Sequence, residues 1–203
     1  TITSSYSGAD SGNYSVTDQS STTADISTKA LTATASASNK TYDGGTTAST
    51  TLTFTGLVGS ETLGQTVGST FDNKNVGSNK TVTVNSITLA DGTGLAANYS
   101  ISAGQTITAH ISPKSLTVSG NTASNKTYNS NSSATVTVTL SGFVGSETLT
   151  YTNSSSFNNK NVGTGKTVTV DSITLADGNN GGLASNYSVT PGQTTTANIT
   201  AKS

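Results

Sequence analysis

The sequence predicts an all-β protein in which small β-sandwich or β-grasp-like repeat domains are arranged end to end as an elongated rod. Short runs alternate apolar residues with Thr, as in Val82-Thr83-Val84 and Val136-Thr137-Val138, and a period of two is typical of strands with one solvated face. Gly and Asx residues interrupt these runs, for example at Asp43-Gly44-Gly45 and Asp91-Gly92. Almost every run occurs twice, which is the signature of a repeat architecture.

The expected strands follow from the alternation, in chain order. In the first copy they include Leu31–Ala35, Leu52–Phe54, Val82–Val84, Ile87–Leu89 and Ile107–Ile111. The phase slips at Asn85-Ser86, which predicts a β-bulge. No window carries a helical stripe, and we expect about six or seven short strands in each repeat.

The cores that this alternation predicts are small. The first contains Tyr42, Phe54, Leu57, Phe71, Val82, Val84, Ile87, Leu89, Tyr99 and Ile101. The second contains Tyr128, Leu140, Phe143, Phe157, Val168, Val170, Ile173, Leu175, Tyr187 and Val189. Stability should therefore depend on backbone ladders and on stacking between neighbouring repeats.

The two copies are related by a constant offset. Asn39-Lys40-Thr41-Tyr42 returns at Asn125-Lys126-Thr127-Tyr128, which is 125 − 39 = 86 residues later. The offset grows to 88 by Asn186, because the second copy has two additional residues in the loop Asn179–Gly182. A tolerated insertion indicates a surface loop.

These matches divide the chain into two full repeats, 28–112 and 113–203. Residues 1–27 match the last part of a repeat, since Asn13-Tyr14-Ser15 corresponds to Asn98-Tyr99-Ser100. We expect them to be the C-terminal part of a preceding repeat in a longer array. Pro113 fixes φ at the boundary and favours an extended joint, as in a semi-rigid rod.

Composition excludes several classes of function. Charged residues make up 9 % of the chain, against about 25 % in an average domain, and the net charge is −1. Scattered charge gives no reason to expect nucleic acid as a partner. The chain has no Cys, so disulfides and thiolate metal sites are absent. No apolar run reaches the ~18 residues of a membrane span, and we expect no membrane insertion by this segment.

Several motifs of the repeated block are specific in combination. They are Lys40-Thr41-Tyr42-Asp43-Gly44, Phe71 with Lys74-Asn75-Val76-Gly77, Lys80-Thr81-Val82, Asn98-Tyr99-Ser100 and Ile111-Ser112-Pro113-Lys114. With them the block resembles the YDG repeat, named for its Tyr-Asp-Gly motif and grouped with the MBG domains of bacterial adhesins and filamentous-haemagglutinin-like surface exoproteins. The second copy departs from the motif, because Asn129-Ser130 stands in place of Asp43-Gly44.

The resemblance implies an extracellular stalk or repeat region on the bacterial cell surface. Such a region spaces an adhesive tip for cell attachment or biofilm formation, and its partners are neighbouring repeats of the same chain. The alternative is that the repeats themselves bind a glycan, an exopolysaccharide or a cell-surface protein. Tyr42, Tyr99, Tyr128 and Tyr187 are then the possible ligand contacts, because exposed rings stack on sugars; the competing interpretation is a buried ring with a hydrogen-bonded hydroxyl.

Catalysis finds little support in the sequence. The single His, His110, corresponds to Asp25 and Asn198 in the other copies, so no Ser-His-Asp set can be built twice. The acids retained between the copies, Glu61/Glu147 and Asp91/Asp177, could be paired acids, but turn chemistry is the favoured interpretation, because Asp-Gly at 91–92 and 177–178 suits a tight turn. We expect no enzyme activity and no cofactor.

The sequence contains candidates for two further kinds of site. Calcium is the more plausible metal, with Asp91 and Asp177 as weak candidates in Gly/Asn loops, although each is a single carboxylate. Lys40, Lys74 and Lys80 recur in the second copy with Asn nearby, and a Lys–Asn isopeptide crosslink would need a buried acid in contact with both. Solvated lysines that close a turn are the alternative.

Overall fold

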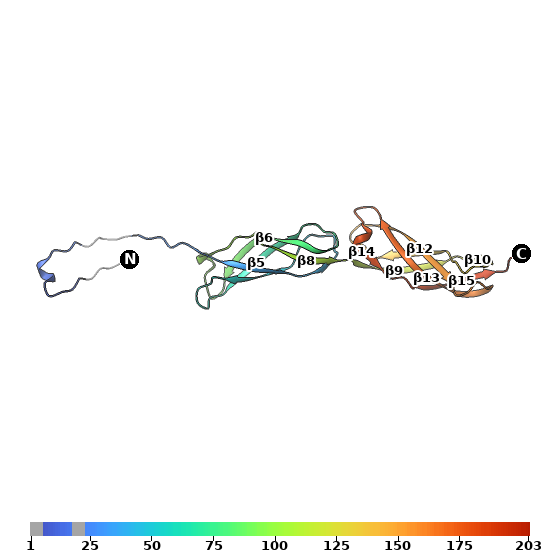
Figure 1. Cartoon of the computed structure of the whole chain (residues 1–203), viewed down its shortest axis with the longest axis horizontal. Coiled ribbons are helices and arrows are strands. Elements are labelled where there is room, and N and C mark those ends of the chain that lie inside the picture. The colour runs from blue at the N-terminus through green and yellow to red at the C-terminus, as the bar shows by residue number, and fades with distance from the viewer. Residues whose placement is uncertain (1–5, 18–22) are drawn as a thin grey trace.

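The computed structural model describes residues 6–17 and 23–203 and contains two β-units that follow one another along a common long axis. Figure 1 shows the units end to end, with residues 6–17 lying beyond the outer end of the first unit. In that segment the only described element is a single 3-10 turn, η1 (Ser11–Asn13). The predicted all-β tandem architecture is confirmed.

The second unit contains two sheets, and the first contains three, because one of its sheets is divided into two pairs of strands. The first unit comprises β1 (Lys29–Ala30), β2 (Thr32–Ala37), β3 (Lys40–Thr41), β4 (Thr50–Thr55), β5 (Leu63–Phe71), β6 (Gly77–Asp91), η2 (Ala96–Asn98), β7 (Tyr99–Ser100) and β8 (Thr106–Ser112). The second comprises β9 (Lys114–Ala123), β10 (Lys126–Thr127), β11 (Val136–Ser141), β12 (Leu149–Phe157), β13 (Gly163–Asp177), η3 (Ala184–Asn186), β14 (Tyr187–Val189) and β15 (Thr194–Thr200).

The sheets of both units have the same order. A four-stranded sheet runs β3-β8-β6-β5 in the first unit and β10-β15-β13-β12 in the second. The other strands form the pairs β2-β4 and β1-β7 in the first unit, which correspond to the single sheet β11-β9-β14 in the second. Val138 of β11 packs in one buried cluster with Phe157 of β12 and Val168 of β13, so the core lies between two sheets. This is a sandwich arrangement, one of the two that the sequence left open.

The predicted bulge is present in β6. Gly68 pairs with Ser86 and Ser69 pairs with Val84, so Asn85 is the extra residue. The second copy has the same shift at Ser154/Ser155. The bulge returns the apolar residues on both sides of it to the same face of the strand.

Part of the predicted core is only half-buried. Ile87 and Leu89 lie in the last part of β6, beyond the bulge, where the strand pairs with β5 alone. The interior is completed instead by Ala109 and Ile111 of β8, which pairs with the first part of β6. The sequence marks β8 as a strand, but its alternation does not say which strand is central.

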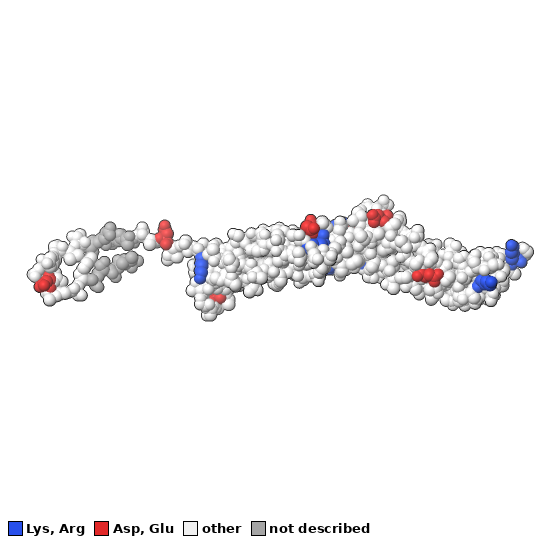
Figure 2. Space-filling view, in the orientation of Figure 1, with Lys and Arg blue, Asp and Glu red and all other residues white. Residues whose placement is uncertain are grey.

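The surface of the rod carries few charges. On the face seen in Figure 2, the charged side chains lie singly or in small groups, with long uncharged stretches between them. In the ranges that the structure describes, no helix has the length and apolar character of a membrane span.

Candidate functional site at the joint between the repeats

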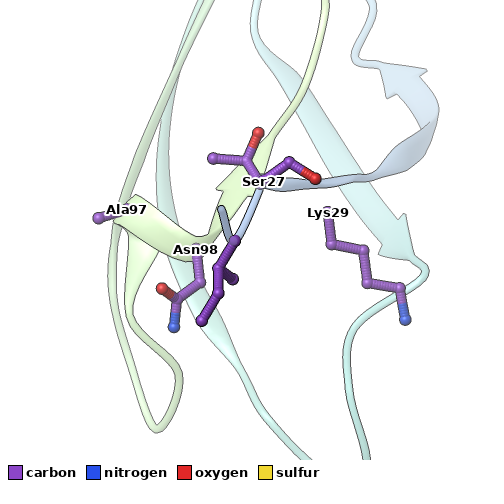
Figure 3. A pocket seen from close by; sticks show the side chains of 6 residues that line it. Ser27, Lys29, Ala97 and Asn98 are labelled. Carbon is purple, nitrogen blue, oxygen red and sulfur yellow. The ribbon is translucent and has the colours of Figure 1, made fainter. Parts of the chain in front are cut away.

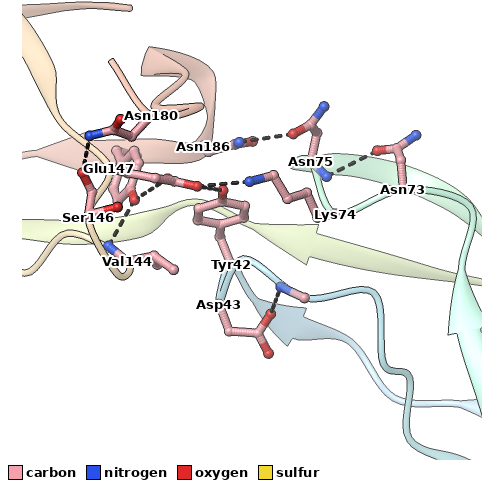
Figure 4. A network of polar contacts seen from close by, with 12 residues as sticks. Tyr42, Asp43, Asn73, Lys74, Asn75, Val144, Ser146, Glu147, Asn180 and Asn186 are labelled. Atoms are coloured by element: carbon pink, nitrogen blue, oxygen red, sulfur yellow. Dashed lines mark hydrogen bonds and ion pairs between the residues drawn. The ribbon is translucent and has the colours of Figure 1, made fainter. Parts of the chain in front are cut away.

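A network of polar contacts lies where the two repeats meet (Figure 4). We call this cluster the joint. Its members from the first repeat are Tyr42, Lys74 and Asn75, and its members from the second are Glu147, Asn186 and Tyr187.

Local structure places each half of the joint at the end of its sandwich. Tyr42 follows β3, which pairs in parallel with the end of β8, and the Tyr42 amide donates to Ser112 O at 2.9 Å. Lys74 lies in the loop between β5 and β6. Glu147 closes the turn before β12, where its amide donates to Val144 O at 3.0 Å, and Tyr187 begins β14.

The Glu147 carboxylate is the centre of the joint. Its side chain is only 7 % exposed. Tyr42 donates its hydroxyl to Oε1 at 2.7 Å, and Tyr187 donates to Oε2 at 2.6 Å. Lys74 Nζ also donates to Oε1, at 2.9 Å. One buried charge is therefore satisfied by donors from both repeats, as burial of a charge requires.

These contacts set the ionisation of the cluster. Burial alone would raise the pKa of Glu147, but hydrogen bonds from Tyr187, Lys74 and Tyr42 outweigh it and hold the pKa below its ordinary value. Burial, reinforced by the bond to this carboxylate, raises the pKa of Tyr187 to about 12. The pKa of Tyr42 is raised for the same two reasons. At neutral pH both hydroxyls are therefore donors and Glu147 is an acceptor.

The joint should consequently loosen in acid. The folded-state pKa of Glu147 lies below the ordinary 4.5, so its stabilising contribution is complete above that pH and is lost as the pH falls through the folded value. Spin labels at Thr81→Cys and Thr167→Cys, in a chain without native Cys, would report this as a distance distribution that broadens below pH 4.5.

A comparison variant isolates this carboxylate. The pKa values of Asp43 and Asp72 are also lowered, through Lys40 and Lys80 respectively, so other groups titrate in the same range. In Glu147→Gln the distribution should already be broad at neutral pH and change little in acid. An acid response of equal size in the variant would show that another group controls the joint.

Aromatic packing surrounds the polar centre. The rings of Tyr42 and Tyr187 meet edge to face at 5.5 Å, and Phe143 meets Tyr187 at 5.7 Å. Lys74 Nζ lies 5.9 Å from the centroid of the Tyr42 ring. The apolar cluster around these rings includes Leu116 of the second repeat and extends across the joint. Dry surroundings of this kind strengthen the hydrogen bonds to Glu147.

An amide completes the contact on the other side. Asn186 is fully buried, at 0 % exposure. Its Oδ1 accepts from the Val76 amide at 2.9 Å, and its Nδ2 donates to Asn75 Oδ1 at 3.1 Å. Because the loop that follows β5 is thereby tied to the turn that precedes β14, the joint is held at two separate points.

The Tyr-Asp-Gly motif has a distinct role at each position. Tyr42 reaches Glu147, as described above. Asp43 accepts from Lys40 Nζ at 2.7 Å and from the Gly45 amide at 2.9 Å, which closes the turn. Gly44 has φ +80°, and a Cβ there would lie 2.7 Å from Val144 Cγ1 of the next repeat. The motif therefore forms part of the first repeat's surface at the joint.

Substituting Gly44 by alanine should weaken the joint for two reasons. The positive φ costs about 1 kcal/mol in an L-residue, and the added methyl group presses on Val144. Gly59→Ala is a matched control, because Gly59 has φ +56° but open space around its Cβ position. We expect Gly44→Ala to broaden the Thr81–Thr167 distance distribution and Gly59→Ala to leave it unchanged. Equal effects would mean that backbone strain alone matters.

The structure distributes the four candidate tyrosines between two environments. Tyr42 and Tyr187 lie in the joint, and Tyr99 is buried at the opposite end of the first repeat, where its hydroxyl bonds to Glu61. Tyr128 is half-buried at the end of the second repeat. Three of the four rings therefore offer no face to a sugar.

The calcium candidates close loops. Asp91 Oδ1 accepts from the Ala96 amide at 2.7 Å, and Asp177 Oδ1 accepts from the Ala184 amide at the same distance. Within the described ranges, no group of three or more His, Cys, Asp or Glu side chains is placed to hold a metal ion. The structure gives each carboxylate a role in loop closure.

His110 also has a structural position. Its Nδ1 accepts from the amide of Asn79, which has φ 53°, at 3.2 Å. In the second copy Asn198 Oδ1 accepts from the Gly165 amide at 2.7 Å in the same way. The imidazole thus does what an asparagine does in the other repeat. Of the retained acids, Glu61 accepts from Tyr99, and Glu147 accepts from Tyr42, Tyr187 and Lys74, whereas Asp91 and Asp177 close loops.

The lysines have different partners. Lys80 Nζ contacts Asn73 Oδ1 and Asp72 Oδ1, each at 2.8 Å. Asp72 is 44 % exposed and its pKa is lowered by Lys80. A crosslink requires a buried, protonated acid and a neutral amine, and an exposed carboxylate paired with the lysine supplies neither. In the second copy Lys166 bonds to Asn159, and Asn158 replaces the acid.

The two ends of the rod carry open recesses. One is lined by Ile26, Ser27, Thr28, Lys29, Ala97 and Asn98 (Figure 3). The other is lined by Thr127, Tyr128, Asn129, Ser130 and Lys202. Both recesses involve positions whose counterparts belong to the joint, since Asn98 corresponds to Asn186 and Tyr128 to Tyr42.

Sequence reasoning missed the joint as a site. The sequence pattern places Tyr42 and Tyr187 in separate cores, and it presents Glu147 only as one of the acids retained in both copies. The available signal was the retention of Glu, Tyr and Lys in both copies, but core residues are retained in the same way.

Comparison with known proteins identifies the repeated unit. A family model described as the YDG domain matches the chain twice, over residues 27–109 and 112–197. No curated protein and no solved structure matches the chain.

Proposed function

Because the chain belongs to the YDG domain family through two matched copies, we propose that it acts as a spacer in an extracellular bacterial adhesin. In this role the repeats form a stalk on the cell surface that carries an adhesive tip away from the cell, for attachment or biofilm formation. Their partners are neighbouring repeats, and their role is structural rather than catalytic.

The observation that supports this proposal is the closed joint. A spacer transmits position only if successive units keep a fixed orientation. Glu147 receives hydrogen bonds from both repeats, and Asn186 ties the loop at Asn75 and Val76. A covalent link of a few extended residues at Pro113 keeps the two surfaces together at high effective concentration.

The surface supports the same role. An exported rod must stay soluble without carrying a strong electrostatic field. A chain rich in Thr and Ser, with few charges on its surface (Figure 2), meets this requirement. Burial of the rings of Tyr42, Tyr99 and Tyr187 argues against the glycan-binding alternative, because it removes three of the four contacts expected for it.

Small-angle scattering tests the spacer role on the 203-residue chain. A globule of this length has a radius of gyration of about 17 Å. We expect a clearly larger value and a pair-distance function with the long tail of a rod. A compact particle would contradict the proposal. A glycan array with the same chain tests the alternative, because a pure spacer should bind no glycan.

A further inference from the structure

Each repeat carries both halves of the joint, at its two ends. We call the end with Tyr42, Lys74 and Asn75 a donor end, and the end with Glu147, Asn186 and Tyr187 an acceptor end. The first repeat has its own acceptor end, made of Glu61, Asn98 and Tyr99. In the described chain, the Glu61 carboxylate receives a hydrogen bond from Tyr99, in the geometry that Tyr187 adopts toward Glu147.

The acceptor end of the first repeat is an exposed apolar surface. Val58 is 53 % exposed and Leu95 is 59 % exposed. Their counterparts in the closed joint, Val144 and Leu183, are half-buried. Asn98 is exposed where Asn186 is fully buried. This surface therefore has the same residue types as the acceptor half of the closed joint. It has no partner among the described residues.

Residues 1–27 indicate what that partner is. Ile26 is 100 % exposed, whereas its counterparts Ile111 and Ile199 are each 1 % exposed in a sandwich core. Tyr14, the counterpart of the buried Tyr99 and Tyr187, is likewise exposed. Tyr14 and Ile26 therefore occupy core positions of a repeat, but no sheet among the described residues covers them.

We propose that the acceptor end of the first repeat docks the Tyr-Asp-Gly donor end of a preceding YDG repeat, whose C-terminal part corresponds in sequence to residues 1–27. The incoming tyrosine and lysine complete the coordination of Glu61, as Tyr42 and Lys74 do at Glu147. An asparagine at the position of Asn75 binds Asn98. This inference rests on the spacer role and specifies how the array continues.

The glycine of the motif decides which donor end fits. In the closed joint Gly44 lies against Val144, and the counterpart of Val144 at the open acceptor end is Val58. The donor end of the second repeat has Ser130 at this position, with φ 71°. A side chain there would meet Val58 as a Cβ at Gly44 would meet Val144, so a Tyr-Asn-Ser end docks less closely than a Tyr-Asp-Gly end.

The test extends the chain before Thr1 by a second copy of its own residues 28–85, so that residues 1–27 complete a third repeat. Spin labels at Thr81 and at the same position of the added copy report the new joint. Labels at Thr81 and Thr167 report the present one. We expect equally narrow distance distributions at both joints. Glu61→Gln should broaden the new distribution alone, and Glu147→Gln the present one alone.

A matched extension by residues 114–171, which brings a Tyr-Asn-Ser end, should give a broader distribution at the new joint. The inference is overturned if the new joint is broad with both extensions, or if the extension by residues 28–85 adds no strand signal and no cooperative unfolding. Either result, with a narrow present joint, leaves the spacer role standing. A broad present joint would instead contradict the spacer role.

Discussion

Glu147→Ala is expected to uncouple the two repeats. The substitution leaves the buried hydroxyls of Tyr42 and Tyr187 without their acceptor. Hydrogen bonds to a charged group contribute about 1.5–3 kcal/mol each, so the loss should be at least about 3 kcal/mol. Lys74 adds little to this figure, because its side chain is 38 % exposed and solvent screens its charge.

Urea unfolding checks this expectation, because coupled repeats unfold together and uncoupled repeats unfold in separate transitions. Glu61→Ala is the matched control. It removes the same residue type from the open acceptor end, where Tyr99 is the described side-chain donor. We expect a much smaller loss of stability and a single transition for that variant. Indistinguishable unfolding curves for the two variants would refute the assignment of Glu147 to the joint.

Phe157→Ala is expected to unfold the second repeat while the first remains folded. Phe157 is 3 % exposed, in a cluster whose members all belong to the second repeat. Removing a buried Phe side chain costs about 3–5 kcal/mol, through lost burial and the cavity left behind. A sandwich with so small a core has little stability to lose.

Amide hydrogen exchange resolves this effect by repeat. Protection should be lost in β11–β13 and retained in β5 and β6. Val162→Ala is the control, because that side chain is 54 % exposed and surface changes stay within about 0.5 kcal/mol. Simultaneous loss of protection in both repeats would show that the first repeat cannot stay folded alone.

The strands could be predicted because their signal is local. Alternation at Val82-Thr83-Val84 needs only neighbouring residues, and the slip at Asn85 marked the bulge for the same reason. The joint could not be predicted in this way, since Tyr42 and Glu147 are 105 residues apart. A tyrosine that packs within its own repeat and one that reaches into the next have the same sequence pattern.

The choice of core strand shows the same limit. Ile87 and Leu89 alternate as clearly as Ile107 and Ile111, yet the first pair is half-buried and Ile111 is fully buried. Burial depends on which part of β6 pairs with β8, and β8 pairs only with the first part. The alternation of apolar residues does not reveal which strands pair. Tertiary context decides burial once the strand itself is given.

The path of the chain through each sandwich has a mechanical consequence. The chain enters the first repeat at β1 and leaves it at β8, which lies along the rod and bonds to β6 on one side and β3 on the other (Figure 1). Ladder bonds run roughly across their strands, so tension on Ser112 pulls β8 lengthwise past both neighbours. Several bonds then share the force and must break together, rather than opening one after another from an end.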